Sequence, residues 1–349
     1  MKVWGNLPGD DPERDRKDTE AELEAAGIDL DPPQPGRNQE SHGVPGHSHP
    51  HQQSGPGETP VIGIVGAGSV GTALGVALTR AGWPVHAVAS RDAARRERFR
   101  SLVEVSRAFV DPEALVEEVE LIILAVPDDV VTPLAGTLRM YGGQAMIHTS
   151  GALGADALAA AQAAGTQIGS FHPLVSFADT ERAVAALHGA TIAIEGDDQL
   201  AAMLANMAEA IGATPVRLAA GAKPAYHAAA VLAAGGFVAL LDAIAELGRV
   251  AGLDEQGSLA VYGRLIEGTL GNARALGIGP ALTGPVTRGD LGTLQANLDA
   301  VRRHAPRAMD LYVAAARREI ELAMGRGAVA PEVAQAMRTA LDAAVARPE

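Results

Sequence analysis

The fold follows from residues 61–71, which read VIGIVGAGSVG. The first five letters are an apolar run typical of a buried strand, and a G-x-G-x-x-G turn follows before a helical stretch over 72–80. Gly66 permits the tight turn, Gly68 lets the backbone approach phosphates, and Gly71 allows close packing of helix on strand. Unpaired N–H groups at the helix start then face the anion. The pattern predicts a dinucleotide site whose contacts here are Gly66, Gly68, Ser69, Val70 and Gly71.

The end of the second predicted strand, 85–89, selects between the two nicotinamide dinucleotides. An acidic residue at this point would bind the ribose 2′-hydroxyl of NAD. Instead the strand ends in Ser90 and Arg91, and a guanidinium matches the geometry of a phosphate. We therefore predict NADP in preference to NAD. In the alternative interpretation, the arginines that follow form a solvated helix face and Asp92 contacts the ribose.

Length and composition limit the class of protein. The 349 residues are enough for two domains, 47% of them are hydrophobic, and there is no cysteine for a disulfide, a thiolate nucleophile or a metal site. The net charge of −14 argues against a nucleic-acid or anionic-membrane surface. We found no apolar signal core and no uninterrupted apolar run of about 20 residues, the length that spans a membrane. We expect a cytoplasmic enzyme that binds neither nucleic acid nor membrane.

Residues 1–59 differ from the rest of the chain. They are rich in proline and hold 12 acidic against 5 basic residues. Such a composition cannot bury enough apolar surface to offset the entropy of ordering, so we predict a disordered tail. Its histidines, at 42, 47, 49 and 51, could chelate a metal, although a flexible tract with no ligand is favoured. The folded region shows no His/carboxylate pattern for a metal.

From residue 60 onward, apolar strand-like runs alternate with alanine-rich helical stretches, which predicts a Rossmann-like, doubly wound parallel sheet over 60–220. Ligands bind at the carboxyl edge of such sheets, so Val126 and Pro127, at the end of one strand, are expected to contact the cofactor. The predicted strands are 61–65, 85–89, 109–110, 121–126, 144–148, 167–171, 191–195 and 214–218.

Beyond residue 221 only helical patterns remain, and they predict an all-α domain over 221–349 for substrate binding and dimerisation. Residues 225–250 are apolar almost all round, which indicates a central helix buried by neighbours on several sides. Each glycine of the Gly235-Gly236 pair costs roughly 1 kcal/mol relative to alanine, and a closely approaching helix would explain the pair. A helical domain of this size often completes its core with a second subunit, so we expect a homodimer.

Several motifs of this chain together resemble one bacterial family. It is an oxidoreductase family with a Rossmann-like N-terminal domain and a C-terminal domain of unknown function, and the match covers 60 to about 325. Its helical half is similar to that of the 6-phosphogluconate and β-hydroxyacid dehydrogenase superfamily, and ketopantoate reductase and pyrroline-carboxylate reductase look like distant relatives. The resemblance implies an architecture more than a substrate. It rests on residues 66–71, 121–127, 148–151, 171–174, Lys223 with 226–230, and 282–290.

The same resemblance suggests catalytic residues. The superfamily places a lysine early on the first helix of its helical domain and an asparagine one turn later. Lys223 matches the lysine, and His227 stands where the asparagine is expected. Residues i and i+4 share a helix face, so Lys223 could protonate a nascent alkoxide with His227 beside it. The alternatives are a solvated lysine at a helix start and a histidine satisfied within the core.

Four further residues are candidates for substrate contacts. His148 and Ser150 end a predicted strand close to where a nicotinamide would lie, and Ser150 resembles the substrate-binding serine of β-hydroxyacid dehydrogenases, although a simple turn role is the alternative. His172 follows the next strand and precedes a proline, which favours substrate contact and loop-holding equally. Arg288 could clamp a carboxylate, or form a helix-capping ion pair with Asp290.

These observations predict an NADP-dependent reductase or dehydrogenase for a small oxo or hydroxy acid, for example a ketopantoate-like one. Hydride chemistry belongs to the cofactor, and the protein supplies the acid and the substrate contacts. The alternative is a non-catalytic dinucleotide sensor or scaffold that signals through its dimer or its acidic tail.

Overall fold

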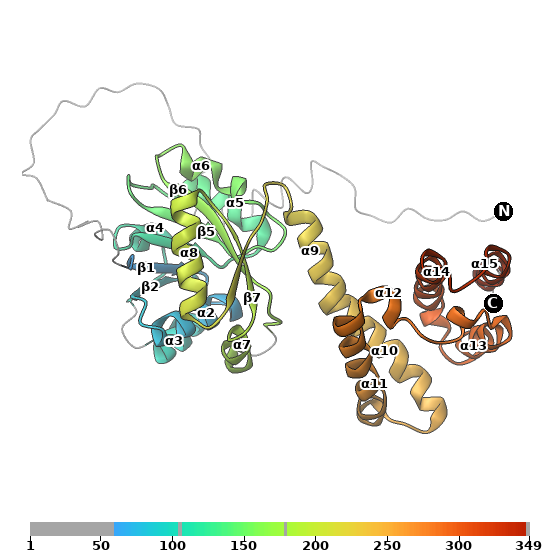
Figure 1. Cartoon of the computed structure of the whole chain (residues 1–349). Helices are drawn as coiled ribbons and strands as arrows, with labels where there is room; N and C mark the ends of the chain where they lie inside the picture. The colour runs from blue at the N-terminus through green and yellow to red at the C-terminus, as the bar shows by residue number, and fades with distance from the viewer. Residues whose placement is uncertain (1–58, 104–106, 178–179, 347–349) are drawn as a thin grey trace, which may run out of the picture. The chain divides into compact units, whose positions relative to one another are not determined.

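The computed structural model describes residues 59–103, 107–177 and 180–346. These residues belong to one compact unit, which spans 52–349. The predicted disordered tail, with its four histidines, lies outside the described residues except for residue 59. The described part begins with an eight-stranded sheet flanked by helices and continues as helices only (Figure 1).

The sheet has the order β3-β2-β1-β4-β5-β6-β7-β8. The chain starts in the middle, moves outward through β2 and β3, and returns to the other side of β1 with β4, which is the switch point of a Rossmann-like fold. All positions of β1 and β4 are buried, as their unbroken apolar sequence requires. The strands are β1 (Ile62–Val65), β2 (Val85–Ala89), β3 (Arg107–Phe109), β4 (Leu121–Leu124), β5 (Ala145–His148), β6 (Gln167–Pro173), β7 (Thr191–Glu195) and β8 (Thr214–Arg217).

One strand departs from the predicted all-parallel arrangement. β7 runs antiparallel to β6, with Ser170 opposite Glu195, whereas β8 is again parallel to β7. An apolar run identifies a buried strand, but it does not encode the direction of that strand. β6 also continues two residues beyond its predicted end, so His172 and Pro173 are strand residues and not loop residues. Proline is tolerated there because the ladder between β5 and β6 ends at Ser170, so no β5 residue pairs with Pro173.

Helices cover both faces of the sheet. One hydrophobic cluster joins the sheet to α2 (Ser69–Arg80), α3 (Ala93–Leu102), α7 (Thr180–Leu187) and α8 (Asp198–Ala210). A second cluster, on the opposite face, involves α4 (Pro112–Val116), α5 (Asp128–Thr137), η1 (Ala155–Leu158) and α6 (Ala159–Gln162). The predicted three-layer α/β architecture is therefore confirmed.

After residue 217 the described chain is helical, as predicted. The last three long helices share a hydrophobic core of their own. The helices are α9 (Lys223–Val231), η2 (Leu232–Gly236), α10 (Phe237–Gly248), η3 (Arg249–Ala251), α11 (Glu255–Leu276), α12 (Ile278–Ala281), η4 (Val286–Arg288), α13 (Leu291–His304), η5 (Pro306–Ala308), α14 (Met309–Gly325) and α15 (Pro331–Val345).

Residues 223–251 form one continuous helical run with a π-helical turn at η2. The prediction that this helix is buried on several sides is wrong, because Leu232 is 72% and Val238 is 64% exposed. Within the described chain α10 packs mainly on α11 and α13, and its Ala243 and Leu247 also contact the small cluster around Ala305. Much of the run stays uncovered. Among the described residues no atom of another helix lies within 4 Å of the Cβ position of Gly235 or Gly236, so no helix packs closely on that side of the pair.

This helical run is also long and apolar enough to cross a membrane, judged by length and composition alone. Its most apolar window has a mean hydropathy of 2.1, and only 6% of that window is buried. This test allows up to two charged residues in the window. The sequence analysis looked instead for an uninterrupted apolar run, and so it did not find this segment. A core helix of a water-soluble protein passes the same test, so the finding is weak evidence for a membrane span.

Candidate functional site

The glycine turn after β1 has the geometry that a dinucleotide needs. Gly66 has φ 109°, and a Cβ there would collide with the carbonyl oxygen of Ala125. A Cβ on Gly71 would collide with the carbonyl oxygen of Gly66, whereas nothing lies within 4 Å of the Cβ position of Gly68. No side chain of the described residues caps the start of α2, so its first N–H groups are available to an anion. The turn therefore fits a diphosphate.

At the end of β2, the polar side chains have distinct structural roles. Asp92 caps α3 by accepting from the backbone N–H of Arg95 at 3.0 Å, so its carboxylate is already engaged. Arg96 donates to the carbonyl oxygens of Ser90 and Arg91 and thereby holds the turn. The Arg91 side chain is exposed, and no described residue forms an ion pair with it. This arrangement favours Arg91 over Asp92 as the group that meets the ribose.

Lys223, the first residue of α9, is 1% exposed. Its Nζ donates to the carbonyl oxygen of Ser150, just beyond β5, at 2.7 Å, and lies 3.8 Å from Oε2 of Glu195. Burial lowers the pKa of Lys223 below its ordinary value, although the carboxylates of Glu195 and Asp128 act in the opposite direction. The solvated-lysine alternative is therefore wrong, and the ammonium is a buried, paired charge.

Glu195 and Ser170 were not predicted as site residues. His148, Ser170 and Glu195 lie in register on three adjacent strands, and all three are buried. The hydroxyl of Ser170 donates to Oε2 of Glu195 at 2.8 Å, which is the same oxygen that faces Lys223. A carboxylate at the end of a predicted strand was the available signal for Glu195, but the reversed direction of β7 could not be read from the sequence.

Three aromatic side chains form the half-buried part of the cluster. Nδ1 of His172 and the hydroxyl of Tyr226 are 3.3 Å apart, and the two rings meet edge to face. The rings of His172 and His227 are also edge to face, with centroids 5.8 Å apart. A Cβ on Gly151 would collide with ring nitrogens of both histidines, so a larger residue there would displace their rings. Tyr226 received no predicted role, although it directly precedes His227.

Two histidines of the cluster, His148 and His172, are poor proton acceptors. Burial, with help from the charge on Lys223, lowers the pKa of His172 to about 4. Burial also lowers the pKa of His148, despite the 2.9 Å hydrogen bond between its Nε2 and the carbonyl oxygen of Gly154. Nδ1 of His148 and Nδ1 of His227 are buried without a partner among the described residues. These two nitrogens remain able to bond a ligand or water.

The structure thus brings five of the predicted residues together, namely His148, Ser150, His172, Lys223 and His227. Within this cluster the hydroxyl of Ser150 accepts from the backbone N–H groups of Ala152 and Leu153, at 3.2 and 3.0 Å. That is the alternative turn role, and the carbonyl group of Ser150 contacts Lys223.

Arg288 does not join the cluster. It is exposed on η4, and no hydrogen bond or ion pair connects it to the cluster within the described part of the chain. Asp290 uses its carboxylate to cap α13 through the backbone and hydroxyl of Thr293, and it forms no ion pair with Arg288 among the described residues.

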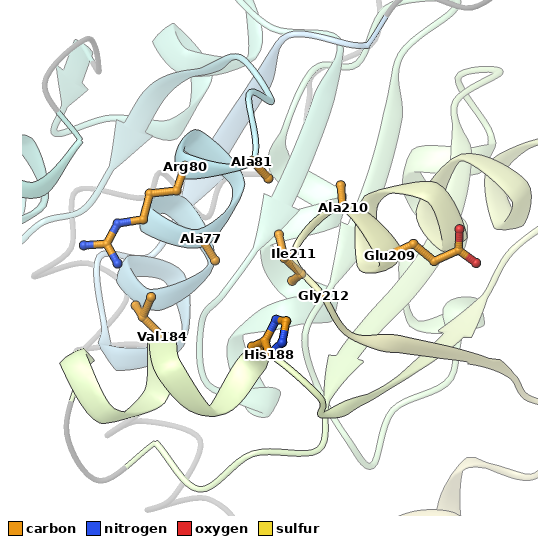
Figure 2. A pocket seen from close by; sticks show the side chains of 9 residues that line it. All are labelled: Ala77, Arg80, Ala81, Val184, His188, Glu209, Ala210, Ile211 and Gly212. Carbon is orange, nitrogen blue, oxygen red and sulfur yellow. The ribbon is translucent and has the colours of Figure 1, made fainter.

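A groove of about 330 Å³ lies away from this cluster, between the ends of α2 and α8 and the end of α7 (Figure 2). Its polar side chains, Arg80, His188 and Glu209, carry mixed charge, and His188 lies against Gly212. The groove is shallow, and it adjoins the end of α2 opposite to the glycine turn, so we do not assign it to the cofactor. No group of three potential metal ligands is found within the described ranges.

Comparisons with known proteins agree with this architecture. A Rossmann-like domain model matches residues 50–173, and the domain of unknown function DUF2520 matches residues 190–319. The chain belongs to the family that combines these two domains. No curated protein matches this DUF2520 chain.

Solved structures share the fold of this DUF2520 protein. A Bacteroides fragilis protein assigned to the NADP oxidoreductases is 24% identical, with a TM-score of 0.62 over 75% of this chain and 98% of its own. An imine reductase from Pseudomonas sp. is 18% identical, with a TM-score of 0.59 over 82% and 100%. A reductive aminase from Aspergillus terreus, in complex with NADPH and ethyl-5-oxohexanoate, is 17% identical, with a TM-score of 0.55 over 82% and 94%.

The lowered pKa of His172 predicts a pH dependence of stability. Between pH 6.5 and about 4 the unfolded chain binds a proton at this residue that the folded chain does not bind, so the contribution of His172 to stability is lost as the pH falls through this window. Urea denaturation at several pH values should show a smaller loss of unfolding free energy for His172→Gln than for the wild type. Equal slopes for the two proteins would contradict this prediction.

Proposed function

We propose that this protein is an NADP-dependent oxidoreductase acting on a small oxo or hydroxy acid. The observation that carries the proposal is a pair of features at the carboxyl edge of one sheet. The glycine turn follows β1 with free N–H groups, and Lys223 is bound at the end of β5. Parallel strands place these two sites at the same edge, where ligands bind in such folds.

The proposed cofactor contacts follow from the turn geometry. Gly66, Gly68, Ser69, Val70 and Gly71 would hold the diphosphate, Ser90 and Arg91 the ribose phosphate, and Val126 and Pro127 line the next loop. The fold relative from Aspergillus terreus was solved in complex with NADPH, which supports NADP over NAD at distant identity. When bound, NADPH supplies a hydride to the substrate carbon.

The cluster supplies the proton. As the carbonyl carbon is reduced, its oxygen takes the electron pair of the C=O bond and needs one proton. Lys223 is the proposed source, since a buried ammonium with a lowered pKa releases its proton more readily than a solvated one. His227, His172 and Tyr226 are half-buried, so they form the part of the cluster that a substrate can reach. His148 and Ser150 remain proposed substrate contacts, whereas Arg288 lies outside the cluster.

A C=N bond is a second candidate for the reduced group. Two of the fold relatives are an imine reductase and a reductive aminase. Within the described residues the charge of Lys223 is balanced by Glu195, and Arg288 lies outside the cluster, so no free cation faces a substrate carboxylate there. A neutral or cationic reacting group is compatible with this balance.

The proposed function is tested by NADPH oxidation with a panel of 2-oxo acids and cyclic imines. For a substrate that is turned over, Lys223→Ala is expected to lower kcat by about 100-fold or more, the usual contribution of a proton donor, with little change in the Kd for NADPH. Unchanged turnover would remove Lys223 from the mechanism. Tight NADPH binding without turnover across the panel would favour the sensor alternative.

The choice of cofactor has a test of its own. Arg91→Gln is expected to weaken NADPH binding by roughly tenfold or more, because a charge-assisted hydrogen bond contributes about 1.5–3 kcal/mol, and to leave NADH binding nearly unchanged. Calorimetric titration of both cofactors measures this difference. Arg80→Gln, in the distant groove, is the matched control. Tighter binding of NADH than of NADPH by the wild type would overturn the choice of NADP.

We also propose a homodimer in which a second copy covers the apolar surface of residues 223–251 and α11. Leu232 and Leu265 are 72% and 67% exposed, and large exposed apolar patches mark interaction sites. Light scattering at micromolar concentration should report a dimer, and Leu232→Glu with Leu265→Glu should shift it to monomer. A monomeric wild type would contradict the proposal, as would association with lipid vesicles in its place.

A further inference from the structure

The chain uses lysine in only three places. These are Lys2, Lys17 and Lys223, against 25 arginines, so every fixed cation beyond residue 17 except Lys223 is an arginine. The two side chains differ in one respect that matters here. A guanidinium is not deprotonated in proteins, whereas a buried lysine loses its proton readily. An arginine-rich chain that has a lysine at its most buried cationic position indicates a need for proton release at that position.

Beside Lys223 lie two buried polar residues, Glu195 and Ser170, to which the proposed function assigns no role. Glu195 is 8% exposed and Ser170 is fully buried. Ser170 donates its hydroxyl proton to Oε2 of Glu195 at 2.8 Å, and this same oxygen faces Nζ of Lys223 at 3.8 Å. The two residues are directly paired across β6 and β7, so the backbone fixes the hydroxyl against the carboxylate. Ser170 therefore orients the carboxylate toward the ammonium.

The other groups that face Lys223 come from three further elements. Asp128 of α5 favours the ammonium, as Glu195 does. His148 of β5 and His172 of β6 also interact with the charge on Lys223, and Tyr226 and His227 lie on its own helix. Glu195 is the anion that forms an ion pair with Nζ in the described structure. Its removal would leave a buried ammonium with Asp128 as its remaining favourable charge.

We propose that Glu195, held by Ser170, is a positioning residue that restores and maintains the proton of Lys223 between turnovers. The inference rests on the proposed function and adds a residue pair to it. In the reductive direction Nζ gives one proton to the substrate oxygen, which has taken the electron pair of the C=O bond. The neutral amine then regains one proton from water, drawn by the adjacent carboxylate. Glu195 itself transfers no proton in this step and does not contact the substrate.

The small number of lysines makes a direct test practical. The full chain labelled with [13Cε]lysine gives three signals, and the signal lost in Lys223→Ala identifies Lys223. In Glu195→Gln the titration of Lys223 is expected to move to lower pH by about one unit or more, the usual effect of removing an opposite charge at this range. Ser170→Ala is expected to cause a smaller shift in the same direction. The basic limb of the kcat/KM profile should move with the NMR titration.

A second variant separates proton release from charge alone. Lys223→Arg keeps the positive charge but cannot lose it, so kcat is expected to fall by about 100-fold or more while the melting temperature shows a folded protein. Turnover within tenfold of the wild type would overturn the inference. So would a Lys223 titration that is unchanged in both Glu195→Gln and Ser170→Ala, and this readout decides if the arginine variant does not fold. Absence of NADPH binding and of turnover would instead defeat the proposed function, and the NMR titration would still decide the role of Glu195.

Discussion

The hydrogen bond from Lys223 to the carbonyl oxygen of Ser150 joins the helical half of the chain to the sheet. A buried ammonium costs several kcal/mol unless it is paired and hydrogen-bonded, and Lys223 meets both conditions only while α9 starts against the ends of β5 and β7. If the helix moved away, a carboxylate and an ammonium would both lose their buried partners. This constraint places Tyr226 and His227 at the sheet edge that also carries the glycine turn.

Much of this site could be predicted from the sequence, because its signals are local. Glycines in the first turn indicate that the backbone is crowded there. Polar residues that follow apolar runs indicate where parallel strands end. His148 and His172 meet Lys223 for that reason, and His227 joins them because it lies one turn further along the same helix. Glu195 was not predicted, although it ends a predicted strand. Its pairing with Ser170 follows from the antiparallel register of β6 and β7, which the packing of the whole sheet decides.

The long apolar helix shows a different limit of sequence interpretation. All-round apolarity over 225–250 predicts burial on several sides, yet Leu232 and Val238 are exposed in the single chain. Apolar composition indicates that a helix surface is stabilised by burial. It does not specify whether the residues that bury it belong to the same chain. The Gly235-Gly236 pair illustrates the same point, since no other helix packs on it among the described residues. It coincides with a π-helical turn, a feature frequent at functional sites.

The continuity of α9, η2 and α10 has a mechanical consequence. Lys223 and the exposed Leu232 stand nine residues apart on one helical rod, about 14 Å at 1.5 Å per residue. Because Lys223 anchors one end of this continuous helix, a tilt of the helix at Leu232 would also move the end that carries Lys223. A molecule bound over Leu232 that tilted this helix would therefore also change the distance between the ammonium of Lys223 and Glu195.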